Sequence, residues 1–232
     1  MEAIVLAGGL GSRLRSTVPN LPKPLAPIGE KPFLDYLLDY WQAQGVKHFI
    51  LSVGYKEELI RNYFGDKYKN SRVDYIVEKK PLGTGGGLLL SVRSLKSNQP
   101  FLVLNGDTLF KINLSNLLKH HSTCKADMTL SLASLADNSR YSEVLLDNSG
   151  KLIRSLKRRH KTSNNKISNG GVYLLERALL NDYQCHNIKY SLEDELLPDL
   201  LKTNKRIAAF VSKEKFIDIG LPEDYRRAQK IL

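Results

Sequence analysis

The first half of the chain alternates short apolar runs with amphipathic segments, and this alternation restricts the possible folds more than any other feature. Apolar runs of strand length lie at residues 3–7, 48–53, 73–78 and 100–107. Segments with helical periodicity separate them, at residues 33–45, 57–64 and, after a group of glycines, 88–95. Strands that alternate with helices predict an α/β fold, in which helices cover both faces of a mostly parallel sheet.

The ligand site of such a sheet lies beyond the carboxyl ends of its strands. Three candidate groups follow apolar runs in the first half: the glycine-rich stretch at residues 8–13, Glu78 and Asp107. Because parallel strands end at the same edge of a sheet, we expect these groups to line one crevice.

The second half is richer in strands. The pattern predicts strands at residues 127–135, 170–176 and 206–212, and a hairpin at 142–156 that turns at 148–150. Ser191 and Asp194 have the spacing of a capping box, which predicts a helix at residues 191–201 that Pro198 bends or divides. A last helix is predicted at residues 222–232, with a proline in its first turn.

The composition is that of a globular protein, with 42% apolar and 25% charged residues. No apolar stretch could span a bilayer, and glycines interrupt the N-terminal apolar run too early for a signal peptide, so a cytoplasmic location is expected. Cys124 and Cys185 have no metal-ligand spacing and are expected to be reduced thiols. No repeat or linker divides the 232 residues. We therefore expect one domain, with a nucleotide-binding half at residues 1–110 and an acceptor half at 111–232.

The net charge of +11 favours anionic partners, which include both nucleic acids and small phosphates. The densest basic run, at residues 157–166, carries no aromatic side chain on which a base could stack. A solvated loop is the better interpretation of this run, so we expect no nucleic-acid partner and no membrane insertion.

The glycine-rich stretch matches neither of the two commonest phosphate-binding motifs. A P-loop needs a lysine and then Ser or Thr directly after its last glycine, whereas Lys23 lies far from the glycines and precedes a proline. A dinucleotide-binding fingerprint through Gly9 and Gly11 would need a small residue where Leu14 stands. What remains is a glycine turn that contains Arg13, and a second cation, Lys23, in a segment stiffened by prolines. An incidental lysine in a proline-rich connection is the alternative interpretation of Lys23.

Taken together, the motifs resemble those of the sugar-1-phosphate nucleotidyltransferases. The stretch "LAGGLGSRL" with "LPKPL" carries the resemblance, and "PLGTGGG", "LNGDT", "NGGVYLL" and "FIDIGLPEDY" follow in the expected order over essentially the whole chain. The resemblance implies a Rossmann-like fold with a mostly parallel mixed central sheet. It also implies a reaction in which the phosphate of a sugar 1-phosphate attacks the α-phosphorus of a nucleoside triphosphate and releases pyrophosphate.

The resemblance also assigns roles to residues. Arg13 would neutralise charge on the leaving pyrophosphate, Lys23 would contact the attacking phosphate or the α-phosphate, and Asp107 with Asp218 would bind Mg²⁺. The expected nucleotide-binding residues are Leu6, Ala7, Gly8, Gly9, Gly11, Ser12, Arg13, Glu78, Gly83, Thr84 and Asp107. The expected sugar-phosphate-binding residues are Asn105, Gly106, Arg159, Asn169, Gly170, Gly171 and Glu193. Glu193 is equally explained as a first-turn acid of its helix.

Glu78 bears on the choice of base. It lies before Gly83, where uridylyl- and thymidylyltransferases of the family commonly have glutamine, which both donates and accepts hydrogen bonds. A carboxylate only accepts, and guanine offers two adjacent donors, so Glu78 favours GTP over UTP.

The stretch "FIDIGLPEDYRRAQ" most resembles the guanylyltransferases that act on D-glycero-D-manno-heptose 1-phosphate. That branch implies a GDP-heptose product for bacterial surface glycans such as capsule, lipopolysaccharide or S-layer. Arg158 and Arg159 stand where many relatives have a Glu-Lys pair, which leaves the sugar contact there in question. A uridylyltransferase of the same fold and a non-catalytic nucleotide-sugar-binding regulator remain alternatives. The sequence leaves the oligomeric state open, and a homo-oligomer is compatible with it.

Overall fold

The computed structural model describes residues 1–134, 143–157, 167–185 and 188–232, and among these one mixed sheet of eight strands forms the centre of the molecule. Its strands are β1 (Glu2–Ala7), β4 (His48–Val53), β5 (Lys67–Tyr68), β6 (Ser71–Val77), β7 (Phe101–Asn105), β9 (Met128–Ser134), β12 (Ile167–Leu175) and β13 (Ile207–Ser212). They lie in the order β13-β9-β12-β7-β1-β4-β6-β5.

The strands from the first half form the parallel part of this sheet. β1 pairs in parallel with β4 and with β7, and β4 pairs in parallel with β6. β12 runs antiparallel to both β7 and β9, while β13 is parallel to β9. The predicted α/β fold with a mixed central sheet is therefore confirmed.

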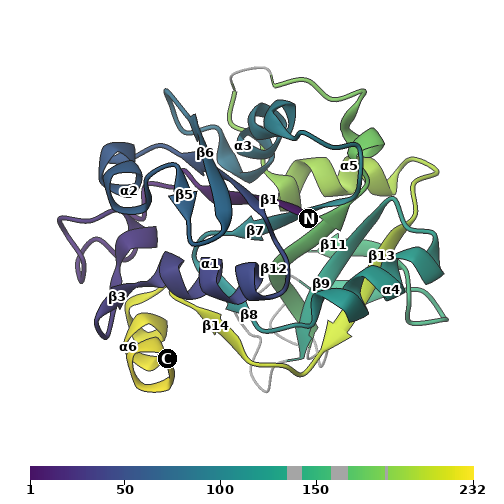
Figure 1. The fold of residues 1–232 in the computed structure, drawn as a ribbon. Coiled ribbons are helices and arrows are strands. Elements are labelled where there is room, and N and C mark those ends of the chain that lie inside the picture. The colour runs from purple at the N-terminus through teal and green to yellow at the C-terminus, as the bar shows by residue number, and fades with distance from the viewer. Residues whose placement is uncertain (135–142, 158–166, 186–187) are drawn as a thin grey trace.

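Helices cover both faces of the sheet (Figure 1). α1 (Phe33–Ala43), α2 (Glu57–Phe64), α4 (Leu114–Cys124) and α6 (Pro222–Ile231) pack on one face, and α3 (Gly83–Ser91) and α5 (Leu197–Leu201) on the other. The central strands place alternate side chains in the two hydrophobic cores. Ala3 and Val5 belong to the core between the sheet and α1, whereas Ile4 belongs to the core between the sheet and α3. This burial on both faces explains why β1 has a continuous apolar sequence.

Short strand pairs complete the fold. β8 (Thr108–Phe110) pairs with β14 (Phe216–Asp218), β10 (Glu143–Leu146) with β11 (Ile153–Lys157), and β2 (Pro27–Ile28) with β3 (Lys31–Pro32). The hairpin predicted at 142–156 corresponds to β10 and β11. The β8–β14 pair is the one that matters for the site, because it joins the segment before α6 to the strand that follows the turn after β7.

Some predicted boundaries were wrong. The helix expected at 88–95 begins at Gly83, and the strand expected to run to Asp107 ends at Asn105, so that Asp107 lies in a turn. The strand expected at 170–176 begins at Ile167. The helix expected at 191–201 is divided into a π-helical turn, Leu192–Leu196, and α5, since Pro198 has no N–H to continue the ladder. The side chain of Ser191 caps the N–H of Asp194 as predicted.

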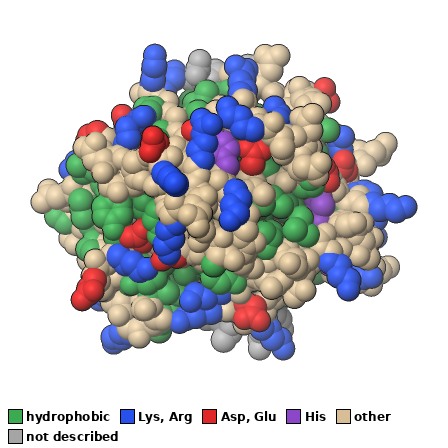
Figure 2. All heavy atoms as spheres, in the orientation of Figure 1, with side chains coloured by type: hydrophobic (Ala, Val, Ile, Leu, Met, Phe, Trp, Pro, Cys, Tyr) green, Lys and Arg blue, Asp and Glu red, His purple; other side chains and the backbone are tan. Residues whose placement is uncertain are grey.

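One face of the molecule carries its charged side chains in a dispersed form. On the face shown in Figure 2, Lys and Arg side chains are scattered, with Asp and Glu between them. Within the described ranges, no helix combines the length and the apolar character needed to cross a bilayer. Cys124 and Cys185 are both free thiols.

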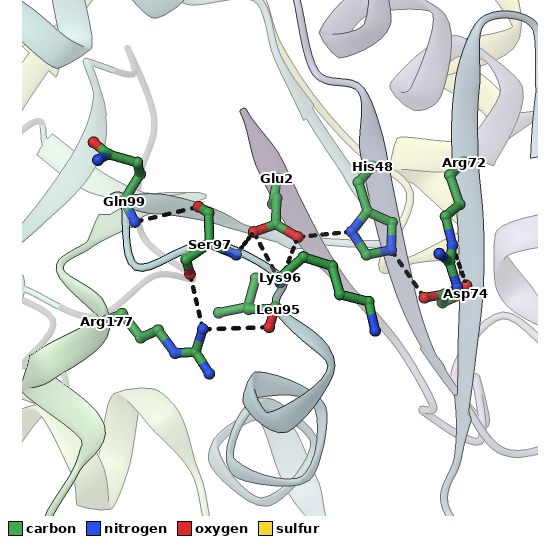
Figure 3. A network of polar contacts seen from close by, with 9 residues as sticks. All are labelled: Glu2, His48, Arg72, Asp74, Leu95, Lys96, Ser97, Gln99 and Arg177. Carbon is green, nitrogen blue, oxygen red and sulfur yellow. Dashed lines mark hydrogen bonds and ion pairs between the residues drawn. The ribbon is translucent and has the colours of Figure 1, made fainter.

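A polar network ties the amino-terminal ends of β1, β4 and β6 to the loop before β7 (Figure 3). The Glu2 carboxylate accepts hydrogen bonds from the backbone N–H groups of Lys96 and Ser97, at 2.9–3.1 Å. It also contacts Nδ1 of His48 at 2.7 Å, and Nε2 of the same ring contacts Asp74 at 3.0 Å. Burial alone would raise the pKa of Glu2, but these donors outweigh it and hold the pKa below its usual value.

We expect Glu2→Gln to lower the free energy of unfolding at pH 7 by about 1–2 kcal/mol, because the amide cannot replace a charged acceptor for these donors. Since the folded-state pKa of Glu2 is depressed, its contribution is fully present above pH 4.5 and is lost as the pH falls below that value. Urea unfolding of both proteins at pH 7 and at about pH 3.5 measures this difference. Glu57→Gln, which removes an i,i+4 surface pair with Arg61, is the control and should cost at most about 0.5 kcal/mol. Equal losses in the two variants would contradict the prediction.

Candidate active site

A pocket of about 380 Å³ opens at the edge of the sheet where β1, β6 and β7 end. It is lined by Leu6, Ala7, Gly8, Gly9, Leu10, Gly11, Ser12, Arg13, Lys23, Pro24, Glu78, Pro81, Gly83, Thr84, Asn105, Gly106, Asp107, Lys189 and Gly220. The glycine-rich stretch, Glu78 and Asp107 therefore meet in one crevice, as expected for groups that follow parallel strands.

The glycine loop after β1 holds its shape through its own contacts. Gly11 has a φ of +60°, a left-handed conformation that favours glycine, and a Cβ there would lie 3.1 Å from the Cβ of Lys23. The carbonyl of Gly11 accepts the N–H of Arg15, whose guanidinium donates to the carbonyl of Leu10 at 3.1 Å. Arg13 is exposed and lines the pocket, so its guanidinium is accessible to a ligand.

Lys23 and Asp107 form an ion pair within the pocket. Lys23 belongs to a short 3-10 turn, Lys23–Leu25, that follows Pro22, and only 11% of its side chain is exposed. Asp107 also accepts the hydroxyl of Thr108 at 3.2 Å. Burial opposes ionisation of Asp107, but the Lys23 ammonium beside it outweighs burial and holds the pKa below its usual value. The carboxylate is therefore ionised at neutral pH.

Asp218 lies next to this pair. β14 places it opposite Thr108 of β8, and the N–H of Ile219 donates to the carbonyl of Asp107 at 3.0 Å. Burial, and then the negative charge of Asp107, raise the pKa of Asp218. Two carboxylates that disfavour each other's ionisation are a suitable site for a divalent cation, because the cation removes that repulsion.

Two carboxylates side by side suit a divalent cation that completes its coordination with water and ligand oxygens, rather than a metal held in a full protein cage. Mg²⁺ is typically held by one or two carboxylates together with phosphate oxygens and water. Among the residues that the structure describes, no cluster of three or more His, Cys, Asp or Glu side chains could hold a metal. Asp107 and Asp218 are therefore the pair of carboxylates in this part of the structure that could hold such a cation.

The Glu78 carboxylate lies where β6 ends, partly buried and facing the pocket. Its Oε1 accepts the hydroxyl of Ser52 at 2.9 Å, and its Oε2 accepts the N–H of Leu82 at 3.0 Å. A Cβ at Gly8 would overlap this carboxylate, and one at Gly87 would lie 2.9 Å from Oε1. Burial raises the pKa of Glu78, and its two donors lower it only in part.

The expected sugar-phosphate residues divide into two groups. Asn105 and Gly106 line the pocket. Asn169, Gly170, Gly171 and Glu193 are not among the lining residues, and neither is Asp218. Gly171, with a φ of +67°, packs against the side chain of Asn105, and Glu193 accepts hydrogen bonds from Thr84 and Tyr173, both at 2.7 Å. Arg158 and Arg159 lie outside the described residues.

Several lining residues were missed from the sequence, namely Leu10, Pro24, Pro81, Lys189 and Gly220. Leu10, Pro24, Pro81 and Gly220 lie inside motifs that the resemblance already contained, so a signal for them was present. Lys189 had no such signal. It reaches the pocket because the N–H of Tyr190 donates to Leu82 and the carbonyl of Tyr190 accepts the N–H groups of Gly85 and Gly86. These bonds attach its segment to the start of α3.

Two relatives match the chain over nearly its whole length. The chain is 42% identical to the D-glycero-alpha-D-manno-heptose 1-phosphate guanylyltransferase of Aneurinibacillus thermoaerophilus, over all of this chain and 98% of the relative. It is 40% identical to the enzyme of the same name from Campylobacter jejuni, over 97% of each chain.

Among solved structures, HddC from Yersinia pseudotuberculosis is similar with a TM-score of 0.86 and 36% identity, over 99% of this chain and 98% of that one. HddC complexed with GMP-PN is similar with a TM-score of 0.83. The model of the nucleotidyl transferase family matches residues 2–232. Fold, pocket and sequence together place the chain in the nucleotidyl transferase family.

Proposed function

We propose that this protein transfers GMP from GTP to D-glycero-D-manno-heptose 1-phosphate, giving a GDP-heptose and pyrophosphate. The observation that carries the choice of GTP is the Glu78 carboxylate in the pocket, an acceptor-only group suited to guanine. The names of the two relatives at 42% and 40% identity, and the GMP-PN complex of HddC, support the same substrates.

The proposed step is an in-line displacement at phosphorus. A phosphate oxygen of the sugar 1-phosphate attacks the α-phosphorus of GTP, the bond from that phosphorus to the bridging oxygen breaks, and pyrophosphate leaves with the electron pair. Such a step depends mainly on positioning and on neutralisation of charge. In this chain the loop from Gly8 to Ser12 would hold the triphosphate, Arg13 the departing pyrophosphate, and Lys23 the attacking or α-phosphate.

Asp107 and Asp218 would hold the divalent cation, for which we propose Mg²⁺. When bound, this cation would neutralise phosphate oxygens and orient them. Lys23, already paired with Asp107, would keep one carboxylate ionised for that purpose.

For the sugar phosphate we propose Asn105 and Gly106 in the pocket, with Asn169, Gly170 and Gly171 beside them and Arg159 from the segment outside the described residues. Glu193 has a different proposed role from the one expected. Its oxygens accept hydroxyls from Thr84 and Tyr173, which ties β12 to the start of α3. We infer that Glu193 fixes the distance between the residues proposed for the sugar phosphate and those proposed for the nucleotide.

Residues 1–232 are proposed to act as one domain, because strands from both halves belong to one sheet. The proposed place of the reaction is the cytoplasm, and the proposed use of its product is in bacterial surface glycans such as capsule, lipopolysaccharide or S-layer. The alternatives weighed from the sequence, a uridylyltransferase and a non-catalytic regulator, are not favoured by the guanylyltransferase relatives.

A panel of substrates tests the proposal. The purified protein with Mg²⁺ is given ATP, CTP, GTP, UTP or dTTP, each with D-glycero-D-manno-heptose 1-phosphate, mannose 1-phosphate or glucose 1-phosphate, and pyrophosphate release is measured. We expect GTP with the heptose phosphate to be the best pair, by at least about a hundredfold in kcat/KM over UTP, because unpaired polar groups penalise the wrong base. A preference for UTP would contradict the assignment of the base, and no turnover with any pair would favour the regulator.

A further inference from the structure

The Glu78 carboxylate is fixed by donors from two separate parts of the fold. Ser52, at the carboxyl end of β4, donates to one oxygen, and the backbone N–H of Leu82, just before α3, donates to the other. Ionised carboxylate oxygens offer about four acceptor sites in total. Each oxygen therefore keeps the capacity to accept another hydrogen bond, and Glu78 lines the pocket from which a ligand would donate it.

Ser52 and Gly87 pack closely against this carboxylate. Ser52 is fully buried, and β4 lies beside β6 in a register that sets Ser52 opposite Ile76. A Cβ at Gly87 of α3 would lie 2.9 Å from Glu78 Oε1 and 3.0 Å from Ser52 Oγ. Glycine at position 87 thus leaves the space that the Ser52–Glu78 pair fills.

Guanine is distinguished by two donors side by side, the ring N1–H and the exocyclic 2-amino group. A carboxylate accepts both only if its plane is held in one orientation, and a free glutamate side chain rotates about its terminal bond. We propose that Ser52 is a positioning residue for base selection, whose hydroxyl, together with the N–H of Leu82, holds the Glu78 carboxylate in the orientation that accepts both guanine donors. This inference rests on the proposed use of GTP.

Inosine triphosphate (ITP) distinguishes a role of Ser52 in base selection from a purely structural role, because its base keeps the N1–H of guanine and lacks the 2-amino group. We expect the wild-type protein to prefer GTP over ITP by about tenfold or more in kcat/KM, equivalent to one well-placed hydrogen bond to a charged group. In Ser52→Ala we expect the KM for GTP to rise by about tenfold with kcat within about twofold, and the GTP/ITP preference to fall toward one. In a Glu78→Gln background, Ser52→Ala should change that preference no further.

Three variants keep the test specific. Ser71→Ala is the matched control, because it removes another fully buried serine hydroxyl with one acceptor, at the opposite end of β6. Ser52→Thr retains the hydroxyl and should restore much of the GTP/ITP preference. Glu78→Asp retains the charge and withdraws the carboxylate from both Ser52 and the base, so it should lose the preference, and adding Ser52→Ala to it should change the GTP/ITP ratio no further. Thermal melts show which variants are folded.

The outcomes separate the two proposals. A GTP/ITP preference that is unchanged in a folded Ser52→Ala, or equally reduced in Ser71→Ala, overturns the role of Ser52 and leaves the proposed function intact. A wild-type protein that uses ITP as well as GTP also overturns it. A wild-type preference for UTP overturns the proposed function, and the role of Ser52 with it.

Discussion

Asp107→Asn is expected to reduce kcat by about a thousandfold or more, equivalent to about 4 kcal/mol of transition-state stabilisation. The amide has nearly the same shape as the carboxylate, but it brings no negative charge to a divalent cation and forms no ion pair with Lys23. Of the two proposed metal ligands, Asp218 alone would then carry a carboxylate. Pyrophosphate release at saturating GTP and Mg²⁺, followed against Mg²⁺ concentration, measures both the loss of rate and any weaker dependence on the cation.

A matched substitution checks that this loss comes from the site. Asp127, like Asp107, faces a lysine; its carboxylate accepts the backbone N–H of Arg206, and it lies near the amino-terminal end of β9, away from the pocket. Asp127→Asn should keep kcat within about twofold, since a surface pair contributes little. Turnover by Asp107→Asn at the wild-type rate would remove Asp107 from the proposed metal site.

The elements that the sequence predicted best are those whose burial is regular. β1 and β4 are buried on both faces and contain uninterrupted apolar runs, at residues 3–7 and 49–51, and α1 buries the stripe Phe33, Leu34, Leu37, Leu38 and Trp41 that its periodicity indicates. α4 was not predicted, because two of its buried positions are His121 and Cys124 rather than aliphatic residues. His121 tolerates burial through contacts with Thr129 at 2.7 Å and Glu176 at 3.3 Å, which lie on other segments.

The candidate site shows the same division. Residues at the ends of parallel strands, such as Glu78, could be located from chain order alone, because topology brings those ends together. β8 and β14, with three residues each, are too short to show a period, so the adjacency of Asp218 to Asp107 was implied only by the family motif. Ser52 could not be found at all. Its contact with Glu78 depends on how β4, β6 and α3 pack, and nothing within "HFILSV" distinguishes it from an ordinary strand serine.

Arg13 is the residue whose proposed contribution lies most in the transition state. It is exposed in the pocket, on a loop whose backbone is held by Gly11 and by the Arg15–Leu10 contact. Charge accumulates on the leaving pyrophosphate only as the bond to the α-phosphorus breaks. A guanidinium that meets that charge lowers the barrier more than it tightens binding of GTP. Its planar fork also matches two phosphate oxygens, which a lysine ammonium does not.

Arg13→Ala is therefore expected to lower kcat by about a thousandfold, the range in which arginines that stabilise phosphoryl transfer contribute, with a much smaller change in the KM for GTP. Arg13→Lys should recover part of the loss, because it restores charge without the fork. Arg226, exposed on α6 and outside the pocket, provides the control, and Arg226→Ala should keep the wild-type rate. Steady-state pyrophosphate release with varied GTP distinguishes the two effects. If KM rises steeply while kcat stays constant, Arg13 binds the triphosphate in the ground state and does not act on the leaving group.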